Sequence, residues 1–128
     1  MSHRWICLLC LLLAAVLTLP VMGEEAPSQL DSERAAFRAF DAGDYQRAAA
    51  LLQEHLRRWP DDPQMIYNLA CAYSRLGETE KAGEALLRAV KAGFRDFDHM
   101  RTDPDLAAVR GEEIFQAKVR FNRREGYP

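Results

Sequence analysis

The sequence predicts an all-α fold built from pairs of short helices. Apolar residues recur every three or four positions between residues 31 and 92, which gives each helix one apolar face. Glycine or proline interrupts the pattern at Gly43, Pro60 and Gly77, so the helices are short. The pattern also repeats, because Gly43 and Gly77 lie 34 residues apart. A repeat of this length indicates helix pairs that stack on one another into a solenoid.

The first 23 residues have the features of an export signal. Arg4 supplies a positive charge, and an uncharged apolar run of 14 residues follows from residue 6 to residue 19. That run is short for a membrane-spanning helix, which needs about 20 residues. We therefore expect residues 1–23 to be a signal peptide cleaved after Gly23, and the protein to be exported, either to a periplasm or out of the cell. Retention as an N-terminal membrane anchor is the alternative.

The composition of the remaining chain restricts its class. The formal net charge of the whole chain is −2, so we expect no nucleic-acid partner. Beyond the signal, Cys71 is the only cysteine, which rules out an internal disulfide. A single domain that depends on packing is predicted. Residues 24–30 are polar and contain Pro27, and we expect them to form a disordered leader.

The first predicted helix begins near Asp31 and Ser32, which are suitable cap residues, and ends before Gly43. The next helix opens at Asp44 and stops at Pro60. The apolar face of this second helix comprises Tyr45, Ala48, Leu52, Leu56 and Trp59.

The second pair of helices begins at Pro63, which suits a first helical turn, with Asp62 as its cap. Gly77 can take the left-handed conformation that ends this helix, and the last helix ends at Gly93. Small residues on the facing sides let the two helices approach closely; these are Ala70, Ala82 and Ala89.

A seven-residue pattern in this pair resembles the tetratricopeptide repeat (TPR) family. The matching residues, in order, are Leu69, Ala70, Tyr73, Gly77, Ala82, Leu86 and Ala89. The resemblance implies two repeats, at about residues 29–62 and 63–96, within a domain covering residues 31–122. The first repeat departs from the pattern at His55, which stands where the family has a small residue. The repeat encodes packing and not chemistry, so it indicates fold more strongly than function.

The sequence leaves the repeat pattern after Gly93. Pro104 lies inside what would be the next helix, which argues against a third regular repeat. Residues 97–122 instead resemble the segment that closes many bacterial TPR arrays, through Asp103, Pro104, Leu106, Val109, Arg110 and Phe115. This implies an irregular helical cap, covered by Ile114, Phe115 and Val119, and a bacterial origin. Residues 123–128 are expected to form a flexible tail.

The resemblance also implies a binding face. In TPR proteins the first helix of each pair lines a concave surface that holds a partner peptide. Transferred to this chain, the candidate partner-binding residues are Glu33, Phe37, Phe40, Tyr67, Asn68, Cys71 and Arg75, with Leu30, Gln64 and Ser74 on the same faces. Phe37 and Tyr67 are the expected apolar contacts, and Asn68 and Arg75 the polar ones. The implied function is non-catalytic: an exported scaffold or assembly factor whose protein partner the sequence does not identify.

A second function stays open. The domain could instead be a structural or oligomerisation subunit of an envelope complex, with no peptide groove and with self-association through its exposed faces. One TPR variant binds a terminal carboxylate through asparagine and lysine residues. Asn68 fits that variant, but Glu33 and Phe37 replace its Lys and Asn, and an acid there repels a carboxylate.

Enzyme and cofactor functions have no supporting pattern. The three histidines, His3, His55 and His99, are not spaced to bind a metal, and no phosphate-binding loop occurs. Cys71 is expected to be a packed thiol. Asp98, His99 and Asp103 could converge on a site, but an Asp-Pro pair more often caps a turn. We therefore expect no enzyme, no metal and no cofactor.

The C-terminal segment is locally basic, through Lys118, Arg120, Arg123 and Arg124. These charges favour the dipole of a final helix. Weak contact with anionic lipid head groups is the alternative interpretation, and apart from an uncleaved signal it is the one membrane contact that we expect.

Overall fold

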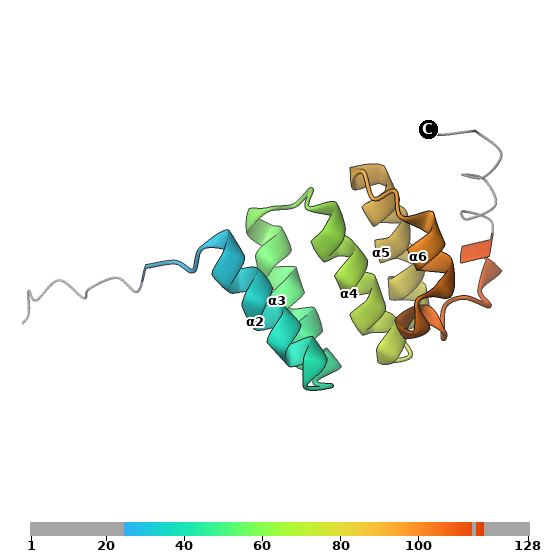
Figure 1. Cartoon of the computed structure of the whole chain (residues 1–128), viewed down its shortest axis with the longest axis horizontal. Helices are drawn as coiled ribbons and strands as arrows, with labels where there is room; N and C mark the ends of the chain where they lie inside the picture. The colour runs from blue at the N-terminus through green and yellow to red at the C-terminus, as the bar shows by residue number, and fades with distance from the viewer. Residues whose placement is uncertain (1–24, 114, 117–128) are drawn as a thin grey trace, which may run out of the picture.

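The computed structural model describes residues 25–113 and 115–116. The elements in this part of the chain are α2 (Gln29–Asp41), α3 (Tyr45–Arg58), α4 (Pro63–Arg75), α5 (Thr79–Ala92), α6 (Phe97–Thr102) and the short 3-10 helix η1 (Pro104–Leu106). Helices α2 and α3 form one hairpin, α4 and α5 form a second, and α3 packs against α4 (Figure 1). No strand occurs among the described residues, which confirms the all-α prediction.

The helix boundaries follow the local signals. Asp44 caps α3 by accepting from the backbone N–H of Arg47, and Asp62 caps α4. Gly77 ends the first helix of the second repeat with φ of 76°, a conformation that disfavours side chains with a Cβ. One boundary prediction was wrong: α2 starts at Gln29 with Ser28 as its cap, so the last two residues of the predicted leader are helical.

Small residues hold the hairpins together. Ala48 in α3 and Ala82 in α5 occupy equivalent positions of the two repeats, and both are completely buried. Ala70 and Ala89 are also completely buried, where α4 and α5 lie against one another. Larger side chains such as Leu52 and Leu86 fill the space beside them. The close approach and the dense core follow from this alternation of small and large residues.

An irregular cap closes the C-terminal end of the stack. Helix η1 packs on both α4 and α6. Met100, Leu106, Val109 and Phe115 are buried in the same core as the repeats, so the cap completes that core. The predicted packing of Ile114 and Val119 lies outside the described residues, as do the predicted signal over residues 1–23 and tail over residues 123–128. In the part of the chain that is described, no helix has the length and apolar character needed to cross a membrane.

Candidate functional site

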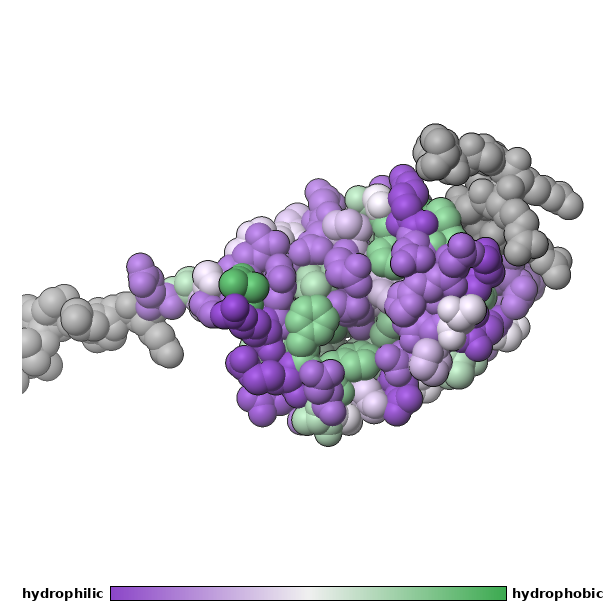
Figure 2. Space-filling model, in the orientation of Figure 1, coloured by the Kyte–Doolittle hydropathy of each residue, from purple (hydrophilic) through white to green (hydrophobic). Residues whose placement is uncertain are grey.

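A pocket of about 220 Å³ lies between α2, α4 and the cap. In the space-filling view, green apolar atoms surround this hollow within a mostly hydrophilic face (Figure 2). Its lining residues come from these three regions and, through Leu52, from α3: Ala36, Phe37, Phe40, Leu52, Gln64, Tyr67, Asn68, Cys71, His99, Asp103 and Asp105.

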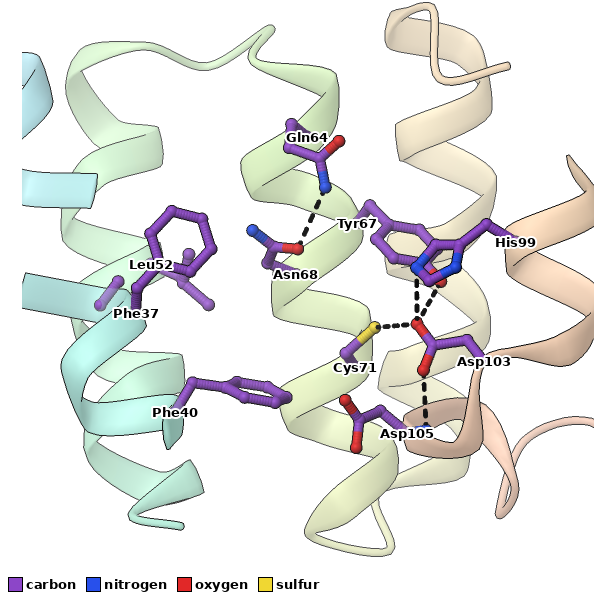
Figure 3. A pocket seen from close by; sticks show the side chains of 11 residues that line it. Phe37, Phe40, Leu52, Gln64, Tyr67, Asn68, Cys71, His99, Asp103 and Asp105 are labelled. Atoms are coloured by element: carbon purple, nitrogen blue, oxygen red, sulfur yellow. Dashed lines mark hydrogen bonds and ion pairs between the residues drawn. The ribbon is translucent and has the colours of Figure 1, made fainter. Parts of the chain in front are cut away.

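The side of the pocket formed by α2 is aromatic. Phe37 and Phe40 lie one turn apart and point from α2 toward α4 (Figure 3). Phe40 is half-buried and contacts the edge of the Tyr45 ring, with 5.1 Å between ring centroids. Phe37 is 43% exposed, although Ala36 and Leu52 beside it are buried. The α2 side therefore offers an exposed aromatic surface next to a closed apolar interior.

The opposite side carries two amides at one end. The Gln64 side-chain amide donates to the Asn68 side-chain oxygen over 3.2 Å (Figure 3). Both residues lie on α4, where Gln64 is exposed and Asn68 is half-buried. Amide side chains both donate and accept hydrogen bonds, as a peptide backbone does. This end of the pocket can therefore pair with an extended backbone segment.

A buried carboxylate joins α4 to the cap. Asp103 is 6% exposed, and its Oδ2 atom accepts from the Tyr67 hydroxyl at 2.6 Å and, more weakly, from the Cys71 thiol at 3.7 Å. The His99 Nε2 atom lies 3.2 Å from the same oxygen. The other oxygen, Oδ1, accepts from the backbone N–H of Asp105. A carboxylate with this many donors is satisfied although it is buried, and it fixes the cap against α4.

The environment of the pocket raises the pKa of three of its groups. Burial, and the nearby Asp103, raise the pKa of Tyr67 and of Cys71 above their ordinary values. Burial and the charge of Asp103 also raise the pKa of Asp105, against the opposing effect of Arg75. A thiol that stays protonated is a poor nucleophile, so Cys71 is suited to packing and not to covalent chemistry.

The comparisons with known proteins agree with this architecture. The family model for the tetratricopeptide repeat matches residues 39–110, which is more than half of the chain. The chain belongs to the tetratricopeptide repeat family. It is similar to a chloroplastic protein from Arabidopsis thaliana, with 43% identity over 49 residues. That match covers 38% of this chain and 15% of the plant protein, so the chain spans a small part of that relative. No solved structure is matched with significance.

As a TPR domain, the protein is a protein–protein interaction module, and no enzyme family matches it. Five of the seven residues predicted to bind a partner do line one pocket: Phe37, Phe40, Tyr67, Asn68 and Cys71. Tyr67 and Cys71, however, are only 2% and 4% exposed. Their polar atoms are directed to Asp103, so they form a wall of the pocket and not its open surface.

Glu33 and Arg75 do not line the pocket. Glu33 lies near His55 and Asp62 on another part of the TPR domain. The Arg75 guanidinium lies 4.7 Å from the centre of the Tyr45 ring and pairs with Asp105 at 3.4 Å. The pocket residues that the sequence did not assign to the binding face are Ala36, Leu52, His99, Asp103 and Asp105. Of these, His99 and Asp103 were considered as a possible site, with capping as the preferred role of the Asp-Pro pair. The sequence signal for the cap side of the pocket was the pair Asp103-Pro104. Asp103 caps η1 and also accepts a hydrogen bond from the Tyr67 hydroxyl.

The buried phenol and thiol give the TPR domain an expected response to alkaline pH. The pKa values of both groups are raised in the folded state. The stability that they provide is therefore fully present below their pKa values in the unfolded chain, 10.0 for Tyr67 and 9.0 for Cys71. It is lost as the pH rises above those values, because the unfolded chain releases protons that the folded chain keeps. We expect the thermal midpoint, followed by circular dichroism, to fall between about pH 8 and about pH 11.

Tyr67→Phe should remove the part of this fall that occurs above about pH 10, although it lowers stability at every pH. Tyr73→Phe changes a half-buried tyrosine outside the pocket and is the matched control, which should retain the full fall. An identical pH profile for the wild type and Tyr67→Phe would contradict the assignment.

Proposed function

We propose that this TPR protein is a non-catalytic scaffold or assembly factor, exported from the cytoplasm, that binds a peptide segment of a protein partner in the pocket between α2, α4 and the cap. Its family supports the binding of proteins. The observation that carries the choice of this pocket is Phe37, a large aromatic side chain left 43% exposed beside an otherwise closed apolar interior.

The size of the pocket favours a peptide side chain over a free small molecule. Pockets for drug-sized ligands enclose roughly 300–1,000 Å³, whereas this one encloses about 220 Å³. One apolar side chain of a partner can enter beside Phe37 and Phe40. The adjoining backbone of the partner then lies within reach of the Gln64 and Asn68 amides. The proposed ligand is therefore an extended segment with one apolar anchor.

The chemistry of the pocket supports a non-catalytic role. The Cys71 thiol is held protonated by burial, which raises its pKa, and Asp103 is occupied by its internal donors. These groups stabilise the cap. The proposal of export rests on the sequence of residues 1–23, with its charged start, its short apolar run and its small residue at position 23.

The test is capture from an envelope extract with the full chain as bait, comparing the wild type with Phe37→Ala. We expect the variant to retain at least tenfold less of the bound partner, because a central aromatic anchor contributes about 2 kcal/mol or more to binding. Leu30→Ala is the matched control: Leu30 is 52% exposed on the same helix, but it does not line the pocket. Circular dichroism should show equal helicity for all three proteins.

The outcomes separate the two functions that the sequence leaves open. Loss of one captured protein with Phe37→Ala, and its retention with Leu30→Ala, supports the pocket. Equal retention by all three baits excludes it. Recovery of the bait alone in every case favours the self-associating structural subunit, which sedimentation of the purified chain would then show as an oligomer.

A further inference from the structure

We propose that Glu33, His55 and Asp62 form a binding site for one divalent transition-metal ion of the zinc type. The three residues come from α2, α3 and the cap position of α4. One potential ligand atom from each lies within 4.8 Å of the other two. The pocket described above does not use these residues, and the TPR pattern has a small residue at the position of His55.

His55 is held in the manner of a metal ligand. Its side chain is completely buried, and its ring packs on Trp59 with 4.7 Å between ring centroids. The Nδ1 atom lies 3.3 Å from the Ser32 hydroxyl oxygen, and the Nε2 atom lies 3.3 Å from Asp62 Oδ2. A metal-binding histidine similarly uses one ring nitrogen for the ion and the other for a hydrogen bond that fixes the ring.

Asp62 presents one oxygen in a fixed position. Its Oδ1 atom accepts from the backbone N–H groups of Gln64 and Met65, each at 3.1 Å, so the start of α4 orients the carboxylate. The Oδ2 atom faces His55 and otherwise receives a long contact of 3.4 Å from the Gln29 amide. This oxygen is available as a single-atom ligand without any loss of the helix cap.

The charges around this cluster favour a cation. Glu33 and Asp62 bring two carboxylates to one buried imidazole. Within residues 25–113 and 115–116, neither carboxylate forms an ion pair with a lysine or an arginine. Two negative charges this close repel one another, and a cation between them turns that repulsion into attraction. A divalent ion would supply that charge.

The spacing and the donor atoms select the type of ion. Two ligand atoms on a tetrahedral zinc ion, each about 2.0–2.1 Å from the metal, lie about 3.3 Å apart. His55 Nε2 and Asp62 Oδ2 have this separation. Calcium and magnesium favour all-oxygen sites, whereas imidazole with carboxylate suits zinc and its first-row neighbours. Glu33 and Asp62 are partly exposed, so solvent can complete the coordination.

The proposed ion would connect the two TPR repeats directly. Helices α2 and α4 both pack against α3, and both line the partner pocket. An ion that joins Glu33 to Asp62 through His55 would fix the start of α2 relative to the start of α4. The separation of the two walls of the pocket would then depend on metal.

The test is calorimetric titration of zinc into the full chain, produced without a histidine tag and first treated with chelator. We expect one saturable zinc ion per chain and a rise in the thermal midpoint that chelator reverses. Glu33→Gln should weaken zinc binding at least tenfold. Glu84→Gln changes an exposed carboxylate on α5 and is the matched control, expected to bind zinc as the wild type does.

His55→Gln should abolish saturable binding, with circular dichroism used to check its fold. If that variant unfolds, Glu33→Gln decides the matter, since among the described residues the Glu33 side chain forms no hydrogen bond or ion pair that the fold would lose. The proposal is overturned if the wild type shows no saturable binding. It is also overturned if Glu33→Gln binds zinc as tightly as the wild type, because Glu33 would then not be a ligand and the ion would not be held by this three-residue cluster.

Discussion

Replacing Asp103 with alanine is expected to lower the free energy of unfolding by about 3 kcal/mol. The substitution removes the acceptor of the buried Tyr67 hydroxyl and of the Cys71 thiol, and it also removes the cap of η1. A buried donor left without an acceptor costs about 1–3 kcal/mol. Urea denaturation of the full chain, followed by circular dichroism, measures this loss.

Asp98→Ala is the matched control for this substitution. Asp98 lies in the same cap, but its side chain is 87% exposed and pairs with Arg101 on the surface. We expect its free energy of unfolding to stay within about 0.5 kcal/mol of the wild type. An equal decrease in the free energy of unfolding for the two variants would mean that the contacts of Asp103 with Tyr67 and Cys71 do not hold the cap in place.

Leu86→Ala is expected to cost about 2–5 kcal/mol, the range for a truncated core leucine. Leu86 lies in α5, is 5% exposed and belongs to the core that joins the hairpins to the cap. Its neighbour Leu87 is partly exposed and lies outside that core, so Leu87→Ala should cost about 1 kcal/mol or less. Thermal and urea unfolding of both variants measures the difference. A similar loss for both would contradict the assigned faces of α5.

Much of the fold could be predicted because its signals are local. Gly43, Gly77 and Gly93 mark helix ends, and all three adopt positive φ. Pro63 begins α4 as its sequence context predicts. The error at the start of α2 has an equally local reason, since Ser28 and Asp31 are both good caps and Ser28 accepts from the backbone N–H of Asp31.

The pocket could be predicted only in part, because half of it depends on contacts between distant residues. Helical periodicity places Phe37 and Asn68 on the inner faces of α2 and α4. It does not reveal that Asp103, 36 residues after Tyr67, reaches back to the Tyr67 hydroxyl. Nor does it reveal that Glu33 approaches His55 and Asp62. Both clusters depend on how hairpins and cap pack in three dimensions, and the spacing of residues within one helix carries no information about that packing.

The cap that closes the stack after two helix pairs has a consequence for how tightly the proposed pocket could hold a partner. The pocket has room for one anchor side chain, and it ends where His99 and Asp103 of the cap begin. So short a contact supports modest affinity, because each anchor must offset the entropy lost on association. Strong retention then requires avidity: a partner that displays several copies of the segment, or several copies of this protein on one assembly. Effective concentration would then set which partners are held.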